Sequence, residues 1–182
     1  MSSFNPPADL RAMLAAPGLA SLDNEPRPGT LDLAALTQQV QTACRAWKIA
    51  DDEKHLVLAA VLLWHDHFDA AHQIAQGVDG PDGSLLHGIV HRREPDFSNA
   101  KYWFRQAGRH ACYTGLANAV SELSSRDSAL VTSLLPNKNW DPFKFVDACA
   151  DAARHQGTKD RRNLLQEIQR LEFCAFLAGL TA

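Results

Sequence analysis

Apolar residues along the chain follow the period of a helix almost throughout. They recur at steps of three and four residues, as one helical face requires, at Leu33, Leu36, Val40, Ala43 and Trp47. Thr30 precedes this pattern and is expected to cap the helix, as Ser98 does before a helix over 98–108. Similar patterns follow to the C-terminus, and no segment alternates as a strand would. We therefore predict an all-α, single-domain bundle of about seven to nine helices.

The first 29 residues are expected to stand apart from the bundle. Residues 17–29, PGLASLDNEPRPG, are rich in proline and glycine and predict a loop after a short leading helix. The predicted organisation is therefore a short helix and loop over 1–29, followed by one helical domain over 30–182.

One helix is predicted to run from about residue 51 to Gln76 and to form the centre of the bundle. Its first half, HLVLAAVLLW, is apolar on every side, so neighbours should surround it. Its second half is polar. At about 100° per residue, His65, Asp69 and His72 would fall within roughly 60° of one another, and His67 would point away.

That shared face suggests a metal site. Two imidazoles and a carboxylate can supply three protein ligands to a divalent metal such as zinc and leave a position open for water. We therefore name His65, Asp69 and His72 as candidate metal ligands. The spacing is permissive, because it matches neither H-E-x-x-H nor the Glu-x-x-His pairs of diiron bundles.

The next helix is expected to fold back against the polar half. It carries His87 and His91 one turn apart on a single side, which places five of the eight histidines in one window. These two residues are candidates for proton transfer. The alternative is structural: the imidazoles and Asp69 hydrogen-bond one another across the helix pair.

Several groups after His91 suggest binding of an anion. Paired guanidinium groups can clamp a phosphate or carboxylate, and a salt-bridge network with Glu94 and Asp96 explains the same arginines equally well. The candidate anion-binding residues are Arg92, Arg93, Glu94, Lys101 and Trp103.

Composition limits the partners and the compartment. The net charge of −3 gives no general field for nucleic acid or anionic lipid, so we expect neither partner. The longest apolar run, Leu56 to Trp64, is too short to span a membrane, and the N-terminus lacks the pattern of a signal peptide. Four scattered cysteines without a C-x-x-C pair fit reduced thiols. We therefore expect a cytoplasmic protein, with FCAF in the last helix used for packing or as a homodimer face.

Two resemblances accompany these patterns. The segment from Leu63 to Gly108, above all WHDHFDAAH and DGSLLHGIVHRREPDFSNAKYWFR, resembles a family of uncharacterised helical proteins and implies no activity. LLWHDHFD resembles the HD-domain metal-dependent phosphohydrolases, which implies a metal-binding pair at His65 and Asp66. That family also uses a histidine on an earlier helix, whereas the only upstream histidine here, His55, lies on the same predicted helix.

Two functions remain open from the sequence. One is metal-dependent hydrolysis of a small anionic molecule, with the metal on His65, Asp69 and His72, proton transfer by His87 or His91, and arginines holding the anion. The other is a non-catalytic ligand-binding or assembly protein whose histidines tie helices together.

Overall fold

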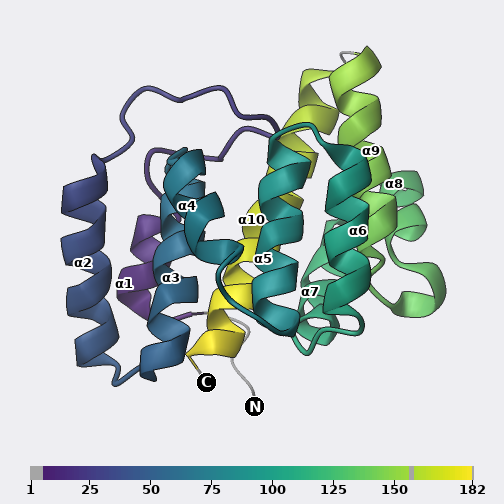
Figure 1. Cartoon of the computed structure of the whole chain (residues 1–182). Helices are drawn as coiled ribbons and strands as arrows, with labels where there is room; N and C mark the ends of the chain where they lie inside the picture. Colours follow the sequence, from purple (N-terminus) through teal and green to yellow (C-terminus); the bar gives the residue numbers. More distant parts are fainter. Residues whose placement is uncertain (1–5, 156–157, 182) are drawn as a thin grey trace.

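The computed structural model describes residues 6–155 and 158–181, which form ten α-helices, two short 3₁₀ helices and no strand (Figure 1). This confirms the all-α prediction. The elements are α1 (Ala8–Met13), α2 (Leu33–Ala46), α3 (Asp51–Trp64), α4 (Phe68–Ala75), α5 (Pro81–Arg93), α6 (Phe97–Ala107), α7 (Tyr113–Ser121), η1 (Glu122–Ser125), α8 (Ser128–Leu134), η2 (Pro136–Lys138), α9 (Pro142–His155) and α10 (Lys159–Leu180).

One hydrophobic core joins these helices. It extends from Leu10 on α1 to Leu180 on α10, and the last helix passes behind α5 in Figure 1. Leu14 and Leu22 of the N-terminal segment are buried in the same core. The described part of residues 1–29 therefore packs with the rest of the bundle.

The predicted single helix over 51–76 is wrong, because α3 ends at Trp64 and a separate helix, α4, begins at Phe68. Asp66 has a left-handed backbone (φ 66°), which aspartate tolerates better than most residues. The apolar half of the prediction holds, since α3 is buried over its last four residues, Val61 to Trp64. The break separates α3 from α4 and changes which histidines can meet.

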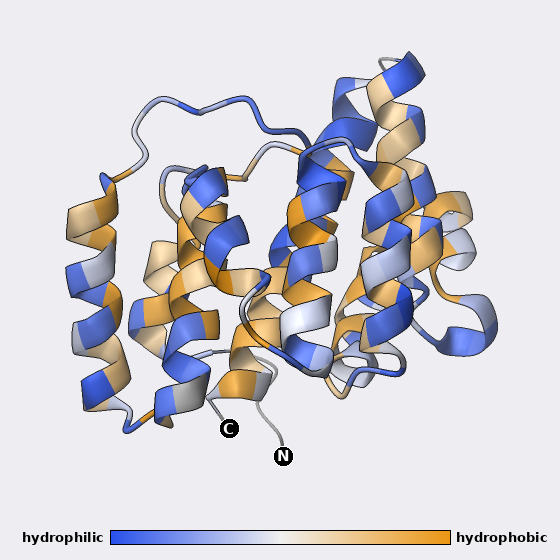
Figure 2. Ribbon diagram, viewed as in Figure 1, coloured by the Kyte–Doolittle hydropathy of each residue, from blue (hydrophilic) through white to orange (hydrophobic). Residues whose placement is uncertain are grey.

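Helix α5 is buried along nearly its whole length, from Gly83 to Arg93. Hydropathy did not indicate this, because several of its residues are polar and appear blue in Figure 2. Gly88 permits close packing with α6: a Cβ there would lie 3.1 Å from the Phe104 ring. Polar side chains of α5 are therefore brought against other elements, where they need partners.

Local side chains begin several helices, although not always the predicted ones. Asp32, not Thr30, caps α2 by accepting a hydrogen bond from the Ala35 amide at 2.9 Å. Asp96, not Ser98, caps α6 through the Asn99 amide at 3.2 Å. Aspartate and the hydroxyl residues are all good caps, so errors of two residues at helix starts are expected.

The C-terminal FCAF segment packs inside the bundle. Its four residues are all buried within the chain, so they form no exposed face for a second copy. None of the helices in the described residues has the length and apolar character needed to cross a membrane.

Candidate metal centre

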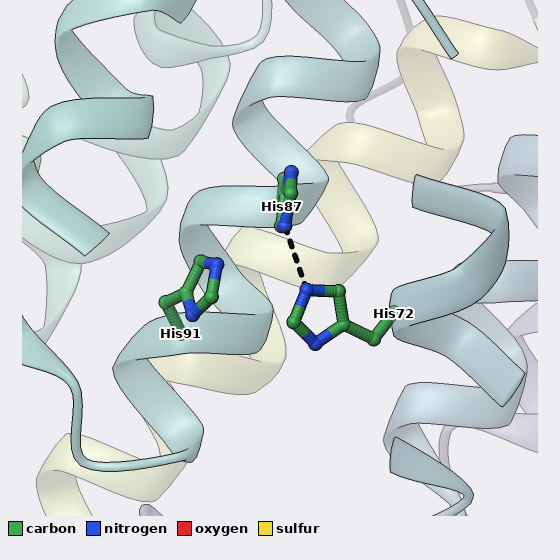
Figure 3. A group of neighbouring side chains, drawn as sticks. All are labelled: His72, His87 and His91. Carbon is green, nitrogen blue, oxygen red and sulfur yellow. Dashed lines mark hydrogen bonds between the residues drawn. The ribbon is translucent and has the colours of Figure 1, made fainter. Parts of the chain in front are cut away.

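Three imidazoles meet where α4 packs on α5. His72 comes from α4, and His87 and His91 lie one turn apart on α5, so that the rings face one another (Figure 3). In the described part of the chain they form the only group of three or more possible ligands whose donor atoms all lie within 4.8 Å of one another. We refer to these three residues as the histidine cluster.

Glu94 holds two rings of the cluster. Its carboxylate oxygens lie 3.1 Å from Nδ1 of His72 and 3.2 Å from Nδ1 of His91. A carboxylate only accepts hydrogen bonds, so both Nδ1 atoms carry protons. In the neutral rings the lone pairs of His72 and His91 therefore lie at Nε2.

His87 completes the pairing. Its Nε2 lies 2.9 Å from Nε2 of His72, and because the His72 nitrogen is an acceptor, His87 donates. The remaining nitrogen, Nδ1 of His87, is buried and has no partner among the described residues. Buried polar atoms in folded proteins are usually hydrogen-bonded, so this nitrogen needs a physical explanation, such as a bound ion or a catalytic role.

Burial disfavours the charged form of the two imidazoles on α5. Desolvation, followed by the neighbouring imidazoles His91 and His72, lowers the pKa of His87 to about 4. Desolvation and His72 also lower the pKa of His91, although Glu94 and Asp96 oppose this. Neutral imidazole is the form that binds a metal ion.

Two further residues fix the rings. The indole of Trp103 stacks on His87, with ring centroids 4.1 Å apart and planes 26° apart. The Asn99 side-chain amide lies 3.1 Å from Nε2 of His91. Trp103, predicted to bind an anion, therefore packs against the cluster. Asn99 was not predicted, because nothing in the sequence distinguishes it from a surface asparagine.

The cluster has the donor set for a zinc-type ion. Zinc–nitrogen bonds of about 2.0–2.1 Å in a tetrahedron place two ligand nitrogens roughly 3.3 Å apart. The His72–His87 separation of 2.9 Å lies within a few tenths of an ångström of that value. Metal binding through Nε2 would require the His87 proton to move from Nε2 to Nδ1. The metal would also take the place of the Asn99 amide at Nε2 of His91. Glu94 would keep its hydrogen bonds to Nδ1 of His72 and His91, as in carboxylate–histidine–metal arrangements.

A hollow of about 660 Å³ lies beside the cluster and is lined in part by Glu94, Asp69, Phe68 and His67. Asp69 is exposed on α4 and faces this hollow. The predicted shared face of His65, Asp69 and His72 is wrong for His65, because the break between α3 and α4 changes the helical phase; Asp69 and His72, three residues apart on α4, remain neighbours. Of the three, only His72 is in the cluster.

His65 and Asp66 are engaged elsewhere. His65 lies 3.0 Å from the Met13 carbonyl through Nε2 and accepts from the Leu31 amide at 3.4 Å through Nδ1. It is buried, and desolvation lowers its pKa. Asp66 accepts hydrogen bonds from Arg27 at 2.9 Å and Arg93 at 2.8 Å. This pair has no free ligand atoms, so it does not form the metal centre that the HD-domain resemblance implies.

Arg92 is directed into the core, away from the cluster. It is 0% exposed and forms two hydrogen bonds with Glu172, at 3.0 and 2.6 Å, and its guanidinium lies 4.4 Å from the Phe145 ring. Gln169 adds a longer contact of 3.4 Å. Arg92 therefore links α5 to α10 and cannot reach an anion at the cluster.

Arg93 is also closed to solvent. It is 0% exposed, pairs with Asp66, and donates to the carbonyls of Ser21 and Leu63. Burial lowers its pKa to about 10, and Asp66 partly opposes this, so the guanidinium stays charged at neutral pH. The prediction that Arg92 and Arg93 edge a pocket is wrong. The predicted pairing with Glu94 and Asp96 is wrong too, since both partners come from distant segments.

The remaining predicted residues lie away from the centre. Lys101 forms an exposed ion pair with Asp147 at 2.6 Å.

Cys112 has a partner that the sequence did not reveal: its Sγ lies 3.1 Å from Nδ1 of His110, whose Nε2 contacts Asp82 at 2.9 Å. Burial raises the pKa of Cys112 far above its usual value, so the group is a thiol and not a nucleophilic thiolate.

Comparison with known proteins leaves the function to be argued from these residues. No protein-family model matches the chain, and neither a curated protein nor a solved structure matches it.

Proposed function

We propose that the histidine cluster binds a divalent transition metal of the zinc type and that the protein uses it to hydrolyse a small molecule. One observation carries the proposal: three imidazoles have ligand atoms within 4.8 Å of one another, and two of them donate from Nδ1 to the Glu94 carboxylate, which leaves their lone pairs at Nε2. Three neutral ligands leave a fourth position for water, which a bound zinc ion would activate near neutral pH.

The roles in this proposal differ from those that the sequence suggested. His72, His87 and His91 are the ligands, and Glu94 orients two of them. Three neutral ligands leave the dication its full charge, so an anionic group on the substrate can bind the metal directly without Arg92 or Arg93. The hollow beside Glu94 is large enough for a small substrate.

The first test is metal binding. We expect one Zn²⁺ or Co²⁺ per chain by calorimetry and elemental analysis, and a tetrahedral cobalt absorption spectrum. His72→Ala and His91→Ala should abolish binding, and Glu94→Gln should weaken it roughly 10- to 100-fold, because it loses the charge that orients both rings. His55→Ala, which removes an exposed histidine from α3, is the matched control and should bind normally.

The second test is hydrolysis. The zinc-loaded protein should cleave members of a panel of chromogenic esters and phosphoesters, and His91→Ala should not. Stoichiometric metal without turnover would leave a non-catalytic metal-binding protein. Absence of binding by the folded wild-type chain would refute the metal centre and favour the second candidate, a polar network that ties α4 to α5. That alternative is supported by the hydrogen bonds that the cluster already forms.

A further inference from the structure

A second cavity, of about 390 Å³, lies on a different part of the molecule. It is formed by the connection between α6 and α7, by the exposed side of α7, and by the segment between α8 and α9. The lining residues that matter for its chemistry are Arg109, Lys138, Thr114, Asn118, Asn139 and Trp140. It shares no lining residue with the hollow beside Glu94.

The charge of this cavity is one-sided. Arg109 and Lys138 are both exposed, and neither forms an ion pair with any residue in 6–155 or 158–181. The residues that line the cavity include no aspartate or glutamate, and Thr114, Asn118 and Asn139 can all donate hydrogen bonds. Two free cations among neutral donors favour an anionic occupant.

The start of α7 adds to this preference. Tyr113 and Thr114, its first two residues, line the cavity. The helix has no side-chain cap and no acidic residue in its first turn. The Tyr113 amide donates to the His110 carbonyl at 3.1 Å, and the first-turn amides that follow it keep the partial positive charge that attracts anions to helix N-termini.

Trp140 supplies a separate indication of a missing acceptor. It lines the cavity and is only 5% exposed, and its buried Nε1–H has no acceptor among the described residues. Indole nitrogen is a donor only, so the group that satisfies it must carry an acceptor.

We infer that this cavity binds a small molecule through a phosphate or carboxylate group, held by Arg109, Lys138 and the first turn of α7. A volume of about 390 Å³ suits a metabolite and is too small for a macromolecular segment. The site does not depend on the metal centre, since none of its residues belongs to the histidine cluster.

The tryptophans allow each site to be followed separately. We would titrate ¹⁵N-labelled protein with inorganic phosphate, and in a second arm with acetate, at constant ionic strength. The Trp140 indole signal, assigned with Trp140→Phe, should shift and saturate in at least one arm, and the preferred arm identifies the anionic group. The Trp103 signal, which reports on the cluster through His87, should stay in place.

Matched variants test the residues. Arg109→Ala and Lys138→Ala should each raise the dissociation constant at least fivefold, because each removes a direct charge–anion contact. Arg105→Ala and Lys144→Ala remove the same charges from exposed positions outside the cavity lining and should leave it unchanged. The inference is overturned if Trp140 shows no saturable shift with either anion, if the control variants weaken binding equally, or if only Trp103 responds.

Discussion

Helix α5 carries two polar networks that differ in how completely they are closed. On one side Arg92 and Arg93 are fully buried and neutralised by Glu172 and Asp66. On the other side the histidine cluster reaches solvent at His72, whose side chain is 28% exposed. Both networks lie within two turns of the same helix.

The two networks differ in how many of their polar atoms are still free to bind a ligand. The carboxylates of the arginine pairs already accept bidentate or multiple hydrogen bonds, so these pairs cannot take a ligand without breaking the fold. The cluster holds lone pairs at Nε2 that only weak partners occupy, together with an unpartnered nitrogen on His87. A buried charge pair thus fixes helix positions, whereas the histidine cluster, which reaches solvent at His72, keeps donor atoms that the proposed metal site would use.

The largest expected effect is on the closed network. Glu172→Gln should lower the free energy of unfolding by about 3–5 kcal/mol, because it leaves the Arg92 charge buried without a counterion. Urea denaturation measures this. Glu167→Gln on the same helix removes only a partly exposed pair with Arg126 and should cost less than about 1 kcal/mol. If both variants lowered the free energy of unfolding equally, the buried pair would be no more important for stability than the exposed one.

The histidine cluster should make the free energy of unfolding depend on pH. The pKa of His87 is about 4 in the folded chain and about 6.5 when unfolded, so between these values only the unfolded state gains the proton. Stability is therefore complete above pH 6.5 and falls by up to about 3 kcal/mol as the pH approaches 4. His91 and His65, whose pKa values are also lowered, add to the same trend.

Replacement of His87 isolates its share. His87→Gln should flatten the decline in unfolding free energy between pH 6.5 and 4, because glutamine does not titrate, whereas His55→Gln should leave the slope as it is. Unfolding curves at a series of pH values provide the measurement. A slope that His87→Gln leaves unchanged would mean that folding does not lower the pKa of His87.

The smallest effect is expected at Lys101. Its exposed pair with Asp147 should contribute less than about 1 kcal/mol, so Lys101→Ala should hardly shift the urea midpoint. Zinc affinity and phosphate affinity should both stay at the wild-type value. A weaker affinity for zinc or for phosphate would instead support the anion-binding role that the sequence suggested for Lys101.

The amino-acid sequence determined the helical class and the region of the candidate site. Apolar spacing of three and four residues defines helices locally, and the i, i+4 spacing of His87 and His91 places their rings together on any helix. Their ring centroids are 4.7 Å apart in the structure. These features needed no knowledge of distant contacts.

The tertiary structure decided which polar residues are partners. Asp66, at the helix break, accepts hydrogen bonds from Arg27 and Arg93, which lie 39 and 27 residues away in the chain, and the break removes His65 from the face of His72. Arg92 finds its carboxylate 80 residues later, on α10. Periodicity carries no information about such long-range pairs, because charge neutralisation in a core depends on which helices pack together and not on local spacing.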